Sequence, residues 1–488
     1  MRLLWVSLFL LLGLSGYAQA AAPPCLAYDP INRNTLFSSS HRVYAHYFSR
    51  FPLSLDNQPT AQDYYAQQYL TASGEGGKWL TRGGFLRSRP LPVAPQPSNT
   101  YVLENMKHEV LLALSRGVNG FAFDILTLDD AGSGGYLKNM EQAVQAVEPR
   151  FHLLLMPDMD ALQGDTDKVR QLVESVYADP SLDRAPNGSL MVAPFLAESV
   201  SPEAWQTLQK TLASEGKPIT FLPTFLSLSS SSVAAYAPQS FGLGLFGTPD
   251  VNQDKTLTQD SAAVHRTGKL FMAGLAPQGY RPKETRYWES LGSLAYRNAW
   301  QGAIGGQAEW VQLTTWNDFS ESTQIIPYMD GNGALGSAFF DLTGYYATWF
   351  LTGHAPPITR DVLTFFYRKE PVAAAAPAEA YALTLSGSSP GADAIELVGF
   401  LTAPGTLKIT AGGQTYAFDV AAGLQSVHVP LVPGTPRFSL ERNHKEIIGF
   451  VGSVRAMDIK GLPDGRRDLT YWSGRANVNG VCALTDGM

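Results

Sequence analysis

Acidic side chains follow several short apolar runs of this chain, and carboxyl groups are among the side chains that perform general acid–base chemistry. Each acid comes just after a run with the composition of a buried strand. The acids are Asp124, Asp158, Asp160, Glu198, Asp318 and Glu321. Taken singly, each could equally be a loop acid or a helix N-cap. If the strands lie parallel in one barrel, however, the acids converge on one mouth and favour glycoside hydrolysis, which uses one protonated and one ionised carboxyl.

The elements that must position these acids alternate along residues 41–350. Apolar runs predict strands at 42–49, 120–126, 151–156, 190–196, 219–225, 242–246, 269–275 and 310–316. Helical stretches are predicted at 104–116, 137–147, 166–178, 202–215, 261–267, 287–300 and 345–351. Eight strands alternating with helices predict an α/β fold, a (β/α)₈ TIM barrel, in a domain at 21–368. Residues 56–98 then form a long first loop on the face of the mouth.

A different sequence pattern follows the barrel. Residues 369–378 include a run rich in alanine and proline, which predicts a linker. Residues 379–488 contain apolar runs with a period of two, separated by Gly and Pro turns. This pattern predicts a C-terminal antiparallel β-sandwich with an accessory role. Whether that domain binds carbohydrate stays open.

Other motifs exclude functions. Gly242-Leu-Gly-Leu-Phe-Gly247 fits G-x-G-x-x-G but lies in a predicted strand with no helix after it, so a nucleotide site is not expected. Asp330-Gly-Asn-Gly begins like a calcium loop, but the residues that follow favour a turn. His41 and His46 are an odd number of residues apart, which places them on opposite faces of one strand. We therefore expect no metal and no cofactor, and a metal-dependent deacetylase has little support.

A family resemblance rests on the eighth predicted strand. Trp310-Val-Gln-Leu-Thr-Thr-Trp-Asn-Asp-Phe-Ser-Glu-Ser322 resembles the T-W-N-D-x-x-E-S signature of glycoside hydrolase family 71, the α-1,3-glucanases or mutanases. Val43–Phe48, Leu114–Asp124 and Leu155–Met159 resemble the family's first three strands. The chain is thus similar to a bacterial-type member of this family. The resemblance implies a (β/α)₈ barrel, no cofactor and inverting, endo-acting hydrolysis of a polysaccharide.

The same resemblance implies the site. Asp318 and Glu321 match the signature acids, and we assign Glu321 as general acid and Asp318 as general base. An inverting pair stands about 6.5–9.5 Å apart, which the bend after a strand could provide. We expect the residues that bind substrate to be Tyr44, His46, Asp124, Asp158, Glu198, Trp316 and Asn317. Trp316, at a strand end, could instead pack in the barrel wall.

Two departures from the family leave the substrate open. Thr323-Gln324 stands where members often have His-Tyr, and Ala276-Pro-Gln-Gly-Tyr280 replaces an aromatic-rich segment. A related extracellular polysaccharide is therefore an alternative substrate to α-1,3-glucan. A different class of function also remains: a catalytically silent polysaccharide-binding protein of an exopolysaccharide or biofilm system, in which the acids only hold hydroxyls.

The ends of the chain indicate where the protein works. Residues 1–20 have one positive residue, an apolar run and a small-residue cleavage site, which predicts a signal peptide and a secreted or periplasmic protein. The run is short for a membrane span, so the mature chain is expected to have no membrane anchor. Cys25 and Cys482 could form one disulfide or remain two buried thiols. With a net charge of −7 the chain offers no basic surface for nucleic acid, and we expect a monomer acting on a polysaccharide.

Overall fold

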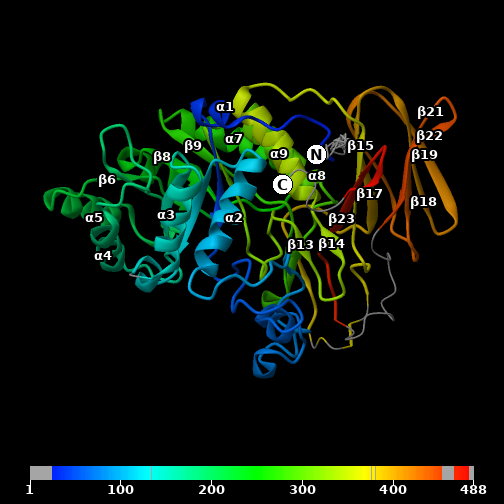
Figure 1. Ribbon diagram of the computed structural model, residues 1–488. Helices are drawn as coiled ribbons and strands as arrows, with labels where there is room; N and C mark the ends of the chain where they lie inside the picture. The colour runs from blue at the N-terminus through cyan, green and yellow to red at the C-terminus, as the bar shows by residue number, and fades with distance from the viewer. Residues whose placement is uncertain are drawn as a thin grey trace, which may run out of the picture.

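The computed structural model describes residues 25–132, 134–374, 376–377, 379, 381–452 and 466–482. The predicted signal peptide at 1–20 lies outside the described residues. A barrel surrounded by helices and a block made of strands lie side by side, and the long loop after the first strand hangs below the barrel (Figure 1). No helix of the described part is long and apolar enough to cross a membrane.

A parallel sheet forms the barrel. In chain order its strands are β1 (Arg42–Tyr47), β3 (Gly120–Ile125), β4 (His152–Pro157), β5 (Leu190–Val192), β6 (Ile219–Phe221), β7 (Thr224–Phe225), β8 (Gly242–Leu245), β9 (Leu270–Leu275) and β12 (Trp310–Leu313). Their order in the sheet is β6-β5-β4-β3-β1-β12-β9-β8-β7. Only two residues separate β6 from β7. Because β6 pairs with β5 and β7 pairs with β8, these two pieces act as one strand and close an eight-stranded barrel. The predicted fold is confirmed.

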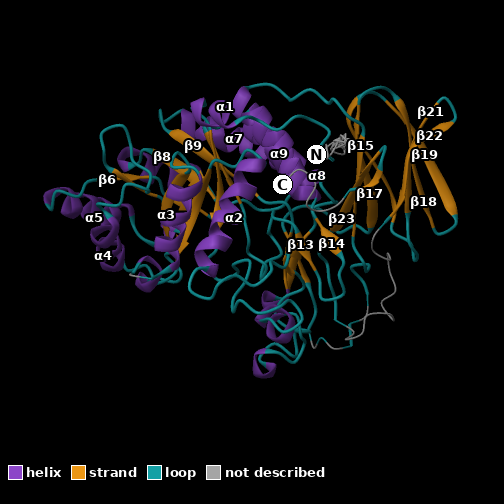
Figure 2. Cartoon of the chain, in the orientation of Figure 1, coloured by secondary structure: helices purple, strands orange, loops and turns teal. Residues whose placement is uncertain are grey.

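Helices cover the outside of this barrel (Figure 2). They are α1 (Arg33–Ser38), α2 (Tyr101–Ser115), α3 (Tyr136–Val147), α4 (Thr166–Val176), α5 (Pro202–Ser214), α6 (Ser230–Tyr236), α7 (Gln253–His265), α8 (Leu294–Gly305) and α9 (Ala338–Thr352). Capping explains two of the starts. Asp165 accepts hydrogen bonds from the first turn of α4, and Ser201 does so for α5, which has Pro202 at its first position.

Alternation along the strands decides which side chains enter the barrel. Tyr44 of β1 and Ala122 of β3 belong to one buried cluster. Side chains of a strand alternate between its two faces, so His46 and Asp124, two residues further on, face the same interior. They are nearer the carboxyl ends of the strands and therefore nearer the mouth.

The predicted helix at 287–300 is the place where the barrel half differs most from expectation. Its first residues form part of β11 (Arg286–Trp288), which pairs with β10 (Gly279–Arg281), and α8 starts only at Leu294. The backbone turns between them because Leu291 and Gly292 both have positive φ angles, 50° and 67°, which no helix accommodates. The β10–β11 hairpin, which turns at Pro282–Glu284, carries Arg281 towards the barrel mouth. Its partner β16 (Thr384–Ser386) completes a three-stranded sheet.

Two antiparallel sheets form the C-terminal sandwich. One contains β15 (Val362–Tyr367), β17 (Ala394–Leu401), β20 (Gly423–Pro430), β23 (Trp472–Asn477) and β24 (Gly480–Val481). The other contains β18 (Gly405–Ala411), β19 (Gln414–Val420), β21 (Arg437–Arg442) and β22 (Lys445–Val451). The sheets pack face to face, since the rings of Phe365 and Phe438 stack with centroids 5.1 Å apart. β15 precedes the predicted linker, yet it pairs with β17 and β23 in the sandwich.

The two halves are joined by polar contacts and by the ends of the chain. Glu396 of β17 is buried and accepts a hydrogen bond from Arg297 of α8 at 3.0 Å. Cys25 and Cys482 form a disulfide, with Cα atoms 5.9 Å apart. A further small sheet of β2 (Arg89–Pro90), β13 (Tyr328–Met329) and β14 (Leu335–Gly336) ties the long first loop to the segment after β12. The barrel mouth is therefore flanked by loops that are themselves anchored.

Candidate active site

Asp318 lies in a tight turn after the last barrel strand. Its backbone N–H donates to Thr315 Oγ1 at 2.7 Å. Its own Oδ1 accepts hydrogen bonds from the N–H and the hydroxyl of Ser320, both at 2.8 Å, and from the N–H of Glu321 at 3.2 Å. The side chain is buried, and Oδ2 makes no hydrogen bond to the described residues. This turn fixes Asp318 and Glu321 relative to each other and leaves one carboxylate oxygen of Asp318 for a ligand.

Glu321 is held by its neighbours on two sides. Its carbonyl accepts a hydrogen bond from the N–H of Tyr280 at 2.9 Å, and Arg281 Nη2 lies 2.6 Å from Glu321 Oε2. Burial and the negative charge of Asp318 raise the pKa of the Glu321 carboxyl to about 7, although Arg281 and Lys283 act in the opposite direction. A glutamic acid with this pKa is partly protonated near neutral pH and can act as a general acid.

His46 and Asp124 form a second pair. Their Nε2 and Oδ2 atoms are 3.5 Å apart, and both side chains are buried. Burial lowers the pKa of His46, but Asp124, Asp158 and Asp318 outweigh it and leave the pKa raised. The pKa of Asp124 is also raised, by burial and by the charges of Asp318 and Asp130, against the effect of His46. The other oxygen of Asp124, Oδ1, is buried without a hydrogen-bond partner in the described structure.

Asp158 completes the group on the β4 side. Its Oδ1 accepts hydrogen bonds from the N–H groups of Asp160 and Ala161, at 2.8 and 3.0 Å. Burial and the charge of Asp124 raise its pKa to about 6. His46, Asp124, Asp158, Asp318 and Glu321 therefore form one electrostatic cluster at the carboxyl ends of β1, β3, β4 and β12.

Four of the predicted substrate-binding residues lie outside this cluster. Glu198 is exposed in the loop after β5, where its Oε1 accepts from the N–H of Leu226 at 2.8 Å. Tyr44 is covered inside the barrel, and its hydroxyl donates to Asp183 Oδ2 at 2.6 Å, on the side away from the mouth. Its ring is therefore not placed to stack on a sugar.

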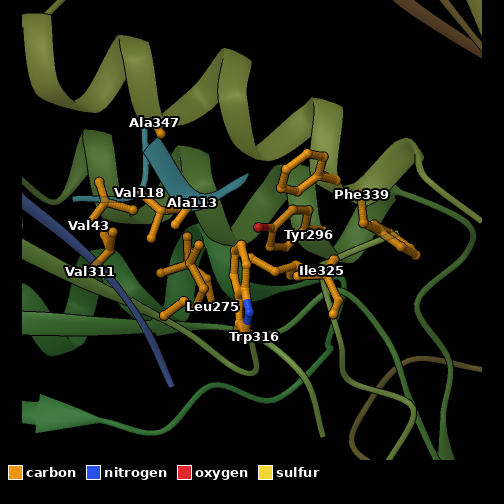
Figure 3. Packing of buried hydrophobic residues seen from close by; sticks show 14 of the residues in the cluster. Val43, Ala113, Val118, Leu275, Tyr296, Val311, Trp316, Ile325, Phe339 and Ala347 are labelled. Carbon is orange, nitrogen blue, oxygen red and sulfur yellow. The ribbon is translucent and has the colours of Figure 1, made fainter. Parts of the chain in front are cut away.

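Trp316 packs in the barrel wall, and Asn317 holds the loop after β1 in place. Trp316 is fully buried among side chains of the barrel wall and α9, the region drawn in Figure 3. Its Nε1 donates to Glu109 Oε1 at 3.2 Å. Asn317 accepts from the N–H of Phe48 at 2.8 Å and donates to the carbonyls of Phe48 and Phe51, both at 3.0 Å. It fixes the loop after β1 and offers no free group to a ligand.

Some residues of the site were not singled out from the sequence. Arg281 and Lys283 lie on the β10–β11 hairpin, and Lys283 Nζ donates to Ser320 Oγ at 3.1 Å. The ring centroids of Phe195 and Phe246 are 4.7 Å apart, and both rings pack against the imidazole of His46. Arg281 and Lys283 directly follow Ala276–Tyr280, where the sequence departs from the family, and this departure is the one signal that points to them. The phenylalanines carried none.

No group of three or more His, Cys, Asp or Glu residues in the described structure could hold a metal ion. The cluster instead presents carboxyls with raised pKa values beside the Asp318 carboxyl, aromatic rings and basic side chains. Such an arrangement can donate and accept protons and can hold neutral hydroxyl groups.

Comparisons with known proteins agree with this chemistry. A match to glycosyl hydrolase family 71 covers residues 96–484. Glucan endo-1,3-alpha-glucosidase agn1 of Schizosaccharomyces pombe is 24% identical over 70% of this chain and 84% of its own length. Mutanase Pc12g07500 of Penicillium rubens is 23% identical over 73% of this chain and 82% of its own.

Among solved structures, the fold resembles the endo-alpha-mannosidase of family GH99 from Bacteroides thetaiotaomicron. The TM-score is 0.50 at 14% sequence identity, over 65% of this chain and 99% of that chain. At this identity the likeness concerns the fold alone. The family match covers well over half of the chain and includes the Asp318–Glu321 turn. The chain therefore belongs to glycosyl hydrolase family 71 and is a glycoside hydrolase.

Proposed function

We propose that the protein hydrolyses α-1,3-glucan inside the chain, by an inverting mechanism in which Glu321 is the general acid and Asp318 the general base. The observation that carries this proposal is the turn on which both carboxyls lie, with the pKa of Glu321 raised to about 7 beside Asp318. The names of the relatives support the substrate, since they include an endo-1,3-alpha-glucosidase and a mutanase.

The reaction assigns one proton transfer to each carboxyl. Glu321 donates its proton to the glycosidic oxygen as the bond from that oxygen to the anomeric carbon breaks. Asp318 accepts a proton from a water molecule, through the Oδ2 atom that the turn leaves without a partner among the described residues. The water oxygen then bonds to the anomeric carbon from the opposite face, which inverts its configuration. Exchange of both protons with solvent restores the starting state.

Neighbouring side chains hold the carboxyls of Glu321 and Asp318 in place. Arg281 fixes the Glu321 carboxyl by contact with Oε2, and Lys283 fixes Ser320, which in turn holds Asp318. His46, Asp124 and Asp158 lie beside the pair, at the ends of the neighbouring strands β1, β3 and β4, where they bound the space for the sugar ring. The protein residues thereby orient the ring before proton transfer, which lowers the entropic cost of reaching the transition state.

The N-terminal segment and the disulfide bear on the compartment in which the enzyme acts. We propose that residues 1–20 direct the chain out of the cytoplasm and that the mature protein acts on an extracellular polysaccharide as a monomer. The disulfide between Cys25 and Cys482 supports an oxidising compartment. One relative is named as an ascus wall endo-1,3-alpha-glucanase, 26% identical over 46% of this chain.

Incubation of the purified protein with insoluble α-1,3-glucan tests the proposal. We expect new reducing ends, oligosaccharide products and, by NMR, first-formed sugars of inverted anomeric configuration. Parallel incubations with α-1,4-glucan and β-1,3-glucan measure the linkage preference. Saturable binding of glucan without new reducing ends would favour the polysaccharide-binding alternative and contradict the proposal. Products with retained configuration would overturn the assigned mechanism but not the hydrolysis.

A further inference from the structure

A hollow opens on the barrel face that carries the site. It has a volume of about 550 Å³, within the range of about 300–1,000 Å³ found for small-molecule sites. Its walls come from four segments: the loop after β1, Val102 in the first turn of α2, the segment around the 3-10 turn Leu128–Ala131 after β3, and the first turn of α3. Both strands end at this face, so the hollow lies on the same face of the barrel as the mouth.

The hollow is linked to the catalytic cluster by short connections. Arg50 lies four residues after His46, and Asp130 lies six residues after Asp124. Arg50 Nη2 is 3.7 Å from Asp130 Oδ2, and that oxygen also accepts hydrogen bonds from the N–H groups of Leu126 and Thr127. The charge of Asp130 contributes to the raised pKa of Asp124. The hollow and the cluster are therefore neighbours at the carboxyl ends of β1 and β3.

Several polar groups that line the hollow have no hydrogen-bond partner among the described residues. The hydroxyl of Tyr136, the carboxylate of Asp129 and the side-chain oxygen of Asn139 make no hydrogen bonds to the described residues, although the Asn139 amide donates to the carbonyl of Gly135 at 3.0 Å. Arg50 is exposed, and Asp130 is its ion-pair partner among the described residues. The lining of the hollow therefore presents both hydrogen-bond donors and acceptors to a ligand, beside the aromatic ring of Tyr136.

The charges and the size of the hollow indicate which kind of ligand it can bind. Two carboxylates against one guanidinium disfavour an anion, and a hollow of this size exceeds what a single water fills, about 30 Å³. A neutral polyhydroxy ring satisfies both donors and acceptors and can lie against the ring of Tyr136, an aromatic side chain with a polar edge. A glucosyl unit has this chemistry.

We propose that this hollow is a glucan-binding subsite that takes a glucosyl unit of the polysaccharide some units away from the bond cleaved between Glu321 and Asp318. The inference rests on the proposed function, because it names the same substrate. Tyr136 and Arg50 are the residues that hold the sugar there. They add affinity for long chains and contribute nothing to chains too short to reach them.

The experiment uses the full-length protein carrying Glu321→Gln, which is expected to bind without cleaving. Its dissociation constants for α-1,3-glucan oligosaccharides of increasing length are measured by calorimetry. Tyr136→Ala and Arg50→Met are then added separately. We expect each to weaken binding of the longest oligosaccharides by about 3- to 10-fold and to leave the shortest unaffected. Tyr416→Ala, an outer-sheet tyrosine whose hydroxyl contacts Gln414, is the matched control with unchanged binding.

Two readouts separate the outcomes. Hydrolysis of α-1,3-glucan by the wild-type protein reports on the proposed function, and the ratio of dissociation constants reports on the subsite. Wild-type hydrolysis with equal constants in all variants would overturn the subsite alone. Absence of both hydrolysis and binding would overturn both. Arg50→Met changes an exposed side chain, so its result holds even where Tyr136→Ala impairs folding.

Discussion

Arg281 Nη2 lies 2.6 Å from Glu321 Oε2, so the carboxyl assigned as the general acid is in direct contact with a permanent positive charge. Burial and Asp318 raise the pKa of Glu321, Arg281 and Lys283 lower it, and the balance gives about 7. Arg281 thus orients the acid but also limits how strongly it retains its proton. The working pH range of the enzyme depends on this opposition.

Replacement of Arg281 by methionine should move the alkaline limb of the pH profile upward. The guanidinium stabilises the ionised form of Glu321, so its removal raises the pKa of Glu321 further. Activity, which needs the protonated form, is then lost at higher pH. The measurement is kcat/KM for glucan between pH 4 and 9. Arg286→Met, on the same hairpin but 3.7 Å from Glu284, is the control. An alkaline limb that stays at the same pH or moves to lower pH would refute the effect of Arg281 on the pKa of Glu321.

Asn317 should be a stability residue more than a binding residue. Its side chain makes three hydrogen bonds to the backbone of Phe48 and Phe51 and is fully buried. Asn317→Ala leaves those groups unsatisfied, so we expect the free energy of unfolding to fall by about 2–4 kcal/mol. Urea denaturation measures it. Asn298→Ala, which removes a single bond to the carbonyl of Val251, should cost less. Equal losses would contradict the bracing role.

Glu109 should make stability depend on pH. It is buried behind the site, where Tyr47 and Trp316 donate to it. Burial raises its pKa from 4.5 to about 8. Between these values the folded state holds a proton that the unfolded state has lost, so stability falls as pH rises, by at most about 1.4 kcal/mol per unit from this group. Glu109→Gln removes this loss.

Denaturation of both proteins between pH 5 and 8 checks the Glu109 prediction. The variant should gain stability relative to the wild type with each step in pH. Glu203→Gln, an exposed glutamate of α5, controls for the substitution itself. A difference that is constant across the range would show that the carboxyl of Glu109 does not retain its proton on folding.

The barrel, and the position of several acids near its mouth, could be predicted because strand runs and the acids that follow them are local signals. Each predicted strand has an observed counterpart, and Asp124 and Asp158 lie at strand ends as expected from their positions after two of these runs. Period alone does not tell how far along the strand a side chain lies. Tyr44 shares the face of His46 but is covered from below by Asp183, which is 139 residues away in sequence.

The remaining misplacements arise where regular structure stops. β12 ends at Leu313, so the alternation no longer applies at Trp316, which turns outward to Glu109. Arg281 reaches Glu321 through a hairpin after β9, and no periodic pattern predicts where such a loop folds back. β15 joins the sandwich because its edges pair with β17 and β23, strands that follow the predicted linker.

The disulfide should contribute to stability. Cys25 and Cys482 are 457 residues apart, and closing a loop of that length stabilises the folded state by about 6 kcal/mol in the chain-entropy model, with less expected in practice. The double variant Cys25→Ser with Cys482→Ser should therefore unfold at lower denaturant concentration than the wild type. A reducing agent should shift the wild type in the same direction and leave the double variant unchanged. Identical midpoints would show that the bridge does not constrain the unfolded chain.

The central claim is that Asp318 and Glu321 are the catalytic pair. Its most direct test is the turnover of Asp318→Asn and Glu321→Gln on α-1,3-glucan, beside Asp160→Asn, an exposed acid of the loop after β4. We expect kcat of the first two to fall by about 10²–10⁴-fold with glucan binding retained, while the control stays near the wild type. Turnover that persists at the wild-type level in both variants would contradict the account.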